Sequence, residues 1–144
     1  MRSPAIAVVD ASVAIDWVAP GADPASPAIR TLARFVRSGE VVLAPELLFV
    51  ECASVLVSGI RRRRWSGAAA DNAYANLLRL PLQTVPDRRH LDRAWELSRR
   101  YDNHPVYDML YAATAEATRH QLFTSDETLL GRLGHLGWVV RPTI

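Results

Sequence analysis

Residues 6–12 read Ile6-Ala7-Val8-Val9-Asp10-Ala11-Ser12, and this stretch decides the fold. The first four residues are apolar and three of them are β-branched, which is typical of a short buried strand. An aspartate follows the strand directly, and Ser12 is placed to cap a short helix that reaches Val18. The stretch therefore predicts a buried strand that leads straight into a helix.

The same alternation of apolar runs and helical patterns continues to the end of the chain. Strands are expected at residues 6–9, 41–43, 82–85, 121–123 and 138–140, and helices at about 12–18, 26–37, 45–62, 66–80, 87–98, 105–117 and 126–133. Strands that are separated by helices pair in parallel through right-handed crossovers. Since no linker or repeat interrupts the pattern, we expect a single α/β domain over residues 1–144, a three-layer α/β/α sandwich with a five-stranded, mainly parallel sheet.

Local signals add expectations about helix ends and buried faces. Pro45 suits the first turn of a helix, and Asp87 is expected to cap the helix that follows it. Gly39 is expected to end the helix before it. The side chains expected in the core include Ile29, Leu32, Ala33, Val36, Trp95 and Trp138.

The composition is that of an ordinary globular protein, with 144 residues, 49% apolar residues and 22% charged residues. No apolar run has the ~18 residues of a membrane span, and Asp10 and Asp16 interrupt the only candidate secretory signal. The single cysteine, Cys52, cannot form an internal disulfide, which fits a reducing cytoplasm, and it is expected to be a small buried hydrophobe. All 17 basic residues are arginine. The lack of lysine excludes a P-loop lysine, a Schiff base and the lysine of phospho-aspartate enzymes.

Two aspartates follow predicted strands, and two further acids interrupt apolar helices. Asp10 and Asp126 come at the carboxyl ends of their strands, where the ligand crevice of a parallel sheet lies. Glu51 is the only charge in residues 47–57, and burying it without a cation or a proton would cost free energy. Asp108 lies in an apolar first helical turn, where the helix dipole favours a negative charge.

Each acid alone has a structural explanation: Asp10 as a turn residue, Asp126 as a helix cap, Asp108 as a first-turn acid and Glu51 as a surface glutamate. Together they would repel one another, and no lysine is present to neutralise them. A hard divalent cation resolves this repulsion, and oxygen ligands suit Mg²⁺ or Mn²⁺. The four histidines show no metal-binding spacing, which argues against zinc. Such a site can activate a water and neutralise charge on a scissile phosphate.

At these residues the sequence resembles the PIN domain, and in particular the VapC toxins of bacterial toxin–antitoxin pairs. Four blocks in the family's order carry the resemblance over essentially the whole chain: Val8-Val9-Asp10-Ala11-Ser12-Val13-Ala14-Ile15, Pro45-Glu46-Leu47-Leu48-Phe49-Val50-Glu51-Cys52-Ala53, Val106-Tyr107-Asp108-Met109-Leu110-Tyr111-Ala112-Ala113-Thr114-Ala115 and Leu122-Phe123-Thr124-Ser125-Asp126. Many relatives carry asparagine three residues after the second-block acid, where this chain has Ser54.

The resemblance implies a metal-dependent endoribonuclease, with Mg²⁺ or Mn²⁺ as its cofactor. Its acidic quartet would be Asp10, Glu51, Asp108 and Asp126, which would act as metal ligands and catalytic residues. Ser12 and Thr124 match polar positions that orient the carboxylates. The resemblance also implies an RNA substrate, a VapB-type antitoxin and a homodimer.

Other polar and aromatic residues have two interpretations. Arg61 and Arg62, in the run from Arg61 to Arg64, could hold RNA phosphates or form a solvated helix end. Trp17 and Trp65 could stack bases, although core or dimer packing is the favoured interpretation. Asp16 is expected at the edge of the crevice or on the surface.

Two rival functions are considered beside the nuclease. A phosphatase or phospho-aspartate receiver also places an aspartate after its first strand, but the absence of lysine counts against it. A catalytically weak PIN-fold module that binds RNA or a protein would not need all four acids.

Overall fold

The computed structural model describes residues 6–142 and contains one five-stranded sheet. Its strands are β1 (Ile6–Val9), β2 (Val41–Pro45), β3 (Leu82–Val85), β4 (Leu122–Phe123) and β5 (Val139–Val140), in the spatial order β3-β2-β1-β4-β5. All four strand pairs are parallel. The predicted parallel α/β sheet is therefore confirmed.

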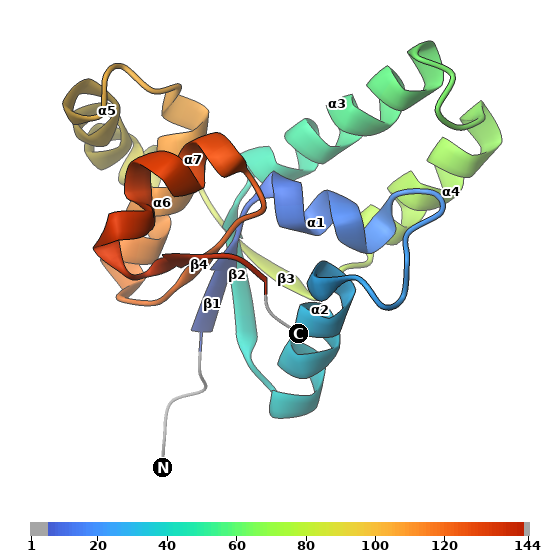
Figure 1. Cartoon of the computed structure of the whole chain (residues 1–144), viewed down its shortest axis with the longest axis horizontal. Helices are drawn as coiled ribbons and strands as arrows, with labels where there is room; N and C mark the ends of the chain where they lie inside the picture. The colour runs from blue at the N-terminus through green and yellow to red at the C-terminus, as the bar shows by residue number, and fades with distance from the viewer. Residues whose placement is uncertain (1–5, 143–144) are drawn as a thin grey trace.

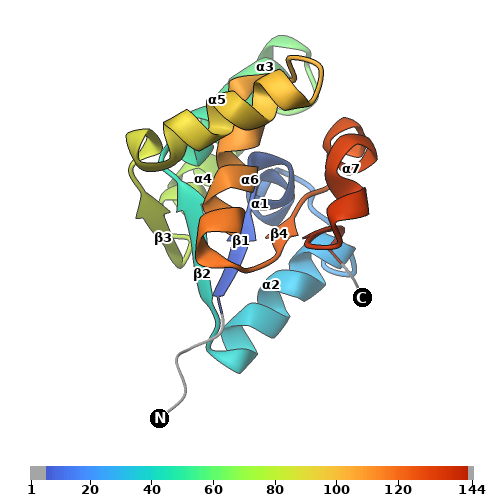
Figure 2. The ribbon, with the colours of Figure 1, turned by 90° about the vertical axis from the view of Figure 1, so that its left-hand side faces the viewer.

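Helices cover both faces of this sheet (Figure 1). The helical segments are α1 (Ala11–Val18), α2 (Pro27–Ser38), α3 (Leu47–Arg61), α4 (Gly67–Leu78), α5 (Leu91–Arg100), α6 (Val106–Thr118) and α7 (Glu127–Leu133), with short 3₁₀ turns at Asp87–His90 and Gly134–Leu136. Helices α1 to α4 lie on one side, and α5 to α7 lie on the other (Figures 1 and 2). The predicted three-layer arrangement is thus observed. Among residues 6–142, none of the helices has both the length and the apolar character that crossing a membrane takes.

The centre of the sheet is a topological switch point. From β1 the chain moves through β2 to β3, and it then returns across the sheet to place β4 on the other side of β1. Connections therefore leave β1 and β4 toward opposite faces, and a crevice opens at the carboxyl ends of these two strands. Asp10 directly follows β1, and Asp126 lies three residues after β4 ends, where it caps α7.

The core forms where β1 packs against α6. Val8 and Val9 of β1 are fully buried, and Met109 and Ala112 of α6 are fully buried as well. Helix α6 buries every residue from Met109 to Ala115, because it is apolar all round and is covered by α5 as well as by the sheet. This burial fixes the side chains at the first turn of α6, next to the crevice.

Three helix ends differ from the prediction. Pro45 is the last residue of β2 and does not open a helix. The carboxylate of Asp87 accepts the Leu47 backbone N–H at 3.1 Å, so it supports the start of α3, which is 40 residues away in sequence. Asp10, and not Ser12, caps α1 by accepting the Val13 backbone N–H at 3.2 Å.

Two predictions about buried faces were also wrong. Helix α2 buries Phe35, whose ring meets Phe123 edge-on at 5.2 Å, and it leaves Val36 64% exposed. Trp95 on α5 is 61% exposed, since α5 turns Ala94 and Leu97 toward α6. In α2 the predicted apolar stripe lies one position away from the buried face, whereas in α5 the predicted Ala94 and Leu97 are buried and Trp95 lies at the exposed side of that face.

Candidate functional site

The predicted acids line one pocket at the carboxyl end of the sheet, here called the acid pocket. Its volume is about 260 Å³, and its lining residues are Asp10, Ala11, Ser12, Ile15, Glu51, Val55, Tyr107, Asp108, Tyr111 and Asp126. The four acids come from four separate segments: the end of β1, α3, the first turn of α6 and the start of α7. Parallel strands and the switch point bring these segments to one edge of the sheet.

Asp10 lies at the bottom of the acid pocket, and the residue is only 4% exposed. One carboxylate oxygen accepts the Ser12 hydroxyl at 2.6 Å and the Val13 backbone N–H at 3.2 Å. The other oxygen accepts the hydroxyl of Thr124, which follows β4. Both predicted polar supports, Ser12 and Thr124, therefore contact Asp10 directly.

The two hydroxyls also fix the loop that carries Asp126. The Ser12 oxygen accepts the Ser125 backbone N–H at 2.8 Å, and the Thr124 oxygen accepts the Asp126 backbone N–H at 3.0 Å. The side chain of Asp126 caps α7 by accepting the Thr128 N–H at 2.9 Å. Asp126 therefore caps a helix and also lines the acid pocket.

Glu51 is held by a tyrosine on a different helix. The Tyr111 hydroxyl donates to a Glu51 oxygen at 2.8 Å. Tyr111 is almost fully buried and lies one turn after Asp108 on α6. The contact therefore links the only acid within the apolar part of α3 to the helix that carries Asp108.

Asp108 is held by a buried histidine. His104 Nε2 lies 2.7 Å from an Asp108 carboxylate oxygen, and the histidine side chain is 2% exposed. The other ring nitrogen, Nδ1, is buried without a hydrogen-bond partner among the described residues. Within the described residues, the hydrogen bond of this ring is therefore the one that Nε2 makes with Asp108.

Burial raises the pKa values of Asp10, Glu51 and Asp108. The pKa of Asp10 rises to about 6, mainly through desolvation and to a smaller extent through the charge of Asp108, against the lowering effect of its hydrogen bonds. Desolvation also raises the pKa of Glu51 and that of Asp108, with added repulsion from the neighbouring acids. Raised proton affinity is expected of crowded carboxylates, but burial contributes more than mutual repulsion.

Among the described residues, His104 is the basic side chain that contacts one of the four acids. Within residues 6–142, no arginine forms an ion pair with any of the four carboxylates. Oxygen-only donors without a lysine or arginine suit a hard divalent cation. In the same part of the chain, no three His, Cys, Asp or Glu side chains are arranged to hold one ion together. The residues fit Mg²⁺, which is commonly bound by one or two carboxylates and keeps several waters.

Other predicted residues lie outside the acid pocket. Arg61 is the last residue of α3 and lines a groove between α3 and α4, and Arg62 is its exposed C-cap. Asp16 lines a different cavity beside the start of α2. Ser54 faces the α3–α4 groove and does not line the acid pocket.

Two residues that contact the acids were not predicted. Tyr111 belongs to the third of the four sequence blocks, and its spacing of three residues from Asp108 on an apolar helix could have indicated a shared face. His104 lies four residues before Asp108, but Pro105 between them hid the contact because α6 begins only after the proline. Histidines that bind a metal can be recognised by their spacing in the sequence. A single histidine that supports an acid has no such spacing.

Comparisons with known proteins agree with this architecture. The PIN domain profile matches residues 7–135, and no curated protein sequence gave a significant match. The crystal structure of PAE2754 from Pyrobaculum aerophilum aligns with a TM-score of 0.65 and 23% identity, over 89% of this chain and 79% of that one. Mycobacterium tuberculosis VapC20, described as a sarcin-ricin loop cleaving toxin, aligns with a TM-score of 0.64 and 22% identity, over 94% of this chain and 99% of that one. With the profile matching most of its length, the chain belongs to the PIN domain family.

Proposed function

We propose that this chain is a divalent-metal-dependent endoribonuclease, a VapC-type toxin that acts in the cytoplasm and is controlled by an antitoxin. One observation carries the proposal: four carboxylates from distant segments line one pocket, and within residues 6–142 no arginine neutralises them. The structural similarity to VapC20 supports this choice within the PIN domain family.

Asp10 and Asp108 would be the main ligands of Mg²⁺ or Mn²⁺, and Glu51 and Asp126 would complete the site directly or through waters. When bound, such an ion neutralises charge on a scissile phosphate and lowers the pKa of a bound water. The protein's own contribution is to hold the carboxylates in place. Ser12 and Thr124 fix Asp10, Tyr111 fixes Glu51, and His104 fixes Asp108.

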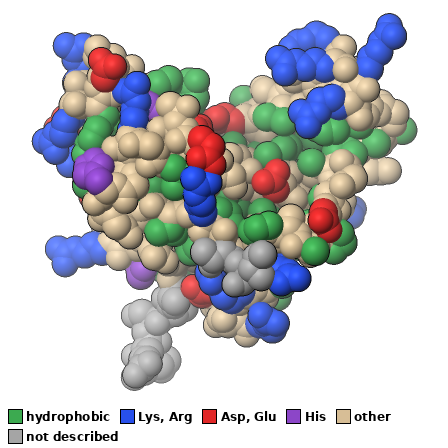
Figure 3. Space-filling model, viewed as in Figure 1, with side chains coloured by type: hydrophobic (Ala, Val, Ile, Leu, Met, Phe, Trp, Pro, Cys, Tyr) green, Lys and Arg blue, Asp and Glu red, His purple; other side chains and the backbone are tan. Residues whose placement is uncertain are grey.

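The charge distribution supports a polyanionic substrate. The acid pocket is a small negative region on a chain whose net charge is +2. Arg61, Arg62, Arg63 and Arg64 are all exposed at the tip of the arm that α3 and α4 form, where Figure 3 shows basic side chains. These arginines, Arg61 and Arg62 in particular, would contact RNA phosphates.

Exposed apolar surface supports two protein partners, an antitoxin and a second copy of the chain. The α3–α4 groove, lined by Phe49, Val50, Ala53, Ser54, Val57, Arg61, Tyr74 and Leu78, contains several exposed hydrophobic side chains. A second exposed pair, Leu91 and Trp95, lies on α5. Apolar surfaces of this kind mark protein interfaces, and the groove adjoins Glu51 through a small cavity that also includes Tyr107.

Cleavage of RNA by the purified protein tests the nuclease proposal. A labelled single-stranded RNA should be cut with Mn²⁺ present and left intact with a chelator. Asp10→Asn should lower the cleavage rate by at least about a hundredfold, because the buried ligand loses its charge. The matched control is Asp16→Asn, which removes the same charge from α1 outside the acid pocket and should cut like the unmodified chain.

Thermal unfolding of both variants separates loss of activity from loss of fold. Equal cleavage by the Asp10→Asn variant, with the fold retained, would mean that another site or a contaminant is responsible.

The alternative is a PIN-fold module that binds RNA or a protein and cleaves weakly or not at all. It rests on the observation that, across the described residues, no three potential ligands are arranged around one ion. Tight RNA binding without metal-dependent cleavage by the unmodified chain would favour this alternative.

A further inference from the structure

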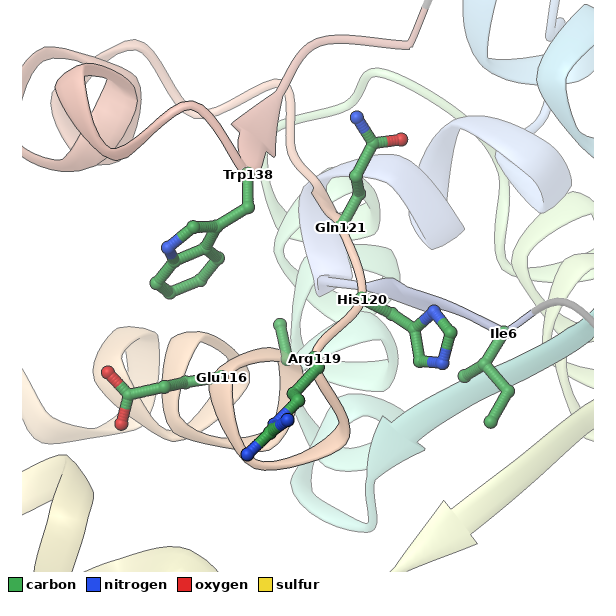
Figure 4. Close-up of a pocket in the computed structure, with 7 residues that line it drawn as sticks. Ile6, Glu116, Arg119, His120, Gln121 and Trp138 are labelled. Atoms are coloured by element: carbon green, nitrogen blue, oxygen red, sulfur yellow. The ribbon is translucent and has the colours of Figure 1, made fainter.

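A second cavity lies at the amino ends of the strands, opposite the acid pocket. Its volume is about 470 Å³, within the range of small-ligand sites. It is lined by Ile6, Ala115, Glu116, Arg119, His120, Gln121 and Trp138 (Figure 4). Ile6 begins β1 and Asp10 follows its end, so the strand separates the two sites by about 13 Å. The cavity, called here the amino-end cavity, is thus distinct from the acid pocket.

The aromatic wall of this cavity is Trp138. The residue is half-buried and packs against the core, which fixes the position of the ring. Aromatic and cation–π contacts within the described part of the chain involve other rings. Figure 4 shows the Trp138 side chain beside the cavity, and its ring is therefore available to another planar group.

The charge in the cavity favours an anion. Glu116 is neutralised by Arg93, which donates to its two oxygens at 2.6 and 3.1 Å and lowers the pKa of the carboxyl group. The guanidinium of Arg119 has no side-chain or backbone partner among residues 6–142 and lines the cavity. His120 also lines the cavity, but its ring points toward Ile6, away from the Arg119 guanidinium and from Trp138 (Figure 4).

We propose that the amino-end cavity binds one nucleotide, with its base stacked on Trp138 and its phosphate held by Arg119. A guanidinium pairs with phosphate through two parallel hydrogen bonds, and bases stack on exposed aromatic faces. The nucleotide is either a free mononucleotide or an unpaired nucleotide of RNA, which share this chemistry. The proposal does not rest on the nuclease activity, because none of the four acids lines this cavity.

NMR of the indole N–H groups tests the proposal with three internal controls. A ¹⁵N-labelled sample with chelator is titrated with 5′-AMP, adenosine, inorganic phosphate and a single-stranded adenylate pentamer, and a Trp138→Phe sample assigns the signal. We expect 5′-AMP to shift the Trp138 signal. The signals of Trp17 and Trp65 should stay in place, since these indoles already donate to Ala28 and Leu56 carbonyls at 2.8 and 2.9 Å.

Trp95 reports non-specific stacking because its ring is exposed on α5. Shifts of Trp95 and Trp138 with the same midpoint would overturn the proposal, as would a Trp138 signal that 5′-AMP and the pentamer leave unmoved. Phosphate alone reproducing the whole effect would also overturn it, because the base would then contribute nothing.

A matched pair of arginine variants tests the phosphate contact. Arg119 has φ 58°, a left-handed conformation that asparagine tolerates, so Arg119→Asn preserves the backbone. It should weaken 5′-AMP binding about tenfold or more and leave adenosine binding unchanged. Arg79→Asn removes the same charge from the exposed C-cap of α4 and should change neither.

Unchanged 5′-AMP affinity in the Arg119→Asn variant would contradict the proposed phosphate contact. Pentamer binding at least as tight as that of 5′-AMP would identify RNA as the source of the nucleotide, and weaker pentamer binding would identify a free mononucleotide.

Discussion

At the scale of single residues, three acids in the pocket are held by side chains other than arginine. Hydroxyls hold Asp10, a phenol holds Glu51 and an imidazole holds Asp108. Hydroxyl groups fix a carboxylate without cancelling its charge, whereas an arginine would compete with a cation. The pocket therefore combines rigid carboxylates with a negative charge that remains available to a metal ion.

The contact between His104 and Asp108 gives a residue-scale prediction. His104→Ala should weaken Mn²⁺ binding by about tenfold or more, because Asp108 loses the donor that orients it. His104→Gln keeps an N–H donor on a side chain of similar reach and should recover most of the affinity. Isothermal titration calorimetry measures both affinities.

The exposed His135 provides the matched control. His135→Ala should bind Mn²⁺ like the unmodified chain. If His104→Ala also bound the ion with unchanged affinity, the histidine would have only a packing role.

At the scale of elements, the position of the acids depends on contacts at helix ends. Asp87, just after β3, supports the start of α3, the helix that carries Glu51. The far end of α3 closes with Arg63 in the left-handed region and with an Arg64 N–H bond to the Gly59 carbonyl at 2.8 Å. This ending is a Schellman motif, so the arginine run leaves the helix at its C-terminus and is not helical throughout.

Gly59 is required where the α3–α4 arm closes. A Cβ atom at Gly59 would lie 2.1 Å from the Trp65 ring, and that ring is held by its bond to the Leu56 carbonyl. Gly59→Ala should therefore destabilise the protein by about 1–3 kcal/mol, despite the better helix propensity of alanine. Urea unfolding measures the change.

Gly131 in α7 is the matched control, because a Cβ atom added there would meet no neighbouring atom within 4 Å. Gly131→Ala should stabilise the protein by up to about 1 kcal/mol. A Gly59→Ala variant as stable as the unmodified chain would show that Trp65 moves aside freely.

At the scale of the whole molecule, the parallel sheet separates two chemically different edges. The carboxyl ends of the strands gather the four acids, and the amino ends gather Arg119, His120 and Trp138. Asp10 is buried at the carboxyl end of the sheet, and desolvation there raises the pKa of its carboxyl group. The pH dependence of folding is therefore tied to the same carboxylates that would hold a metal ion.

The raised pKa of Asp10 gives a whole-molecule prediction. Its value rises from 3.8 to about 6 on folding, so the metal-free folded state binds more protons than the unfolded state between these values. The free energy of unfolding of the metal-free protein should fall by up to about 3 kcal/mol as pH rises through this window. Burial raises the pKa of Glu51 and that of Asp108 in the same direction.

The stabilisation of the protein by added Mn²⁺ should have the opposite pH dependence, because the ion binds ionised carboxylates. Its stabilisation should be small near about pH 5 and grow above about pH 6, as measured by urea unfolding with and without a chelator. Metal-free stability that rises through this window would contradict the burial of an ionisable Asp10.

The sequence by itself determined the parallel α/β fold and the family. Strand-forming runs such as 6–9 and helix stops such as Gly39 are local signals, and an aspartate after a strand in such a sheet must lie near its carboxyl edge. Asp10 and Asp126 could be named in advance for this reason, and Glu51 and Asp108 because each interrupts an apolar helix. Their roles stay predictions until metal binding and cleavage are measured.

Only the tertiary structure decided which side chains meet. The contacts of Asp10 with Thr124 and of Glu51 with Tyr111 join residues more than fifty positions apart, and such pairs depend on how helices rotate against the sheet. The exposure of Val36 and Trp95 has the same cause, because a shift of one position on a helix turns a side chain by about 100°. Periodicity shows that a helix has an apolar face, whereas packing against neighbouring elements selects the side chains that are buried.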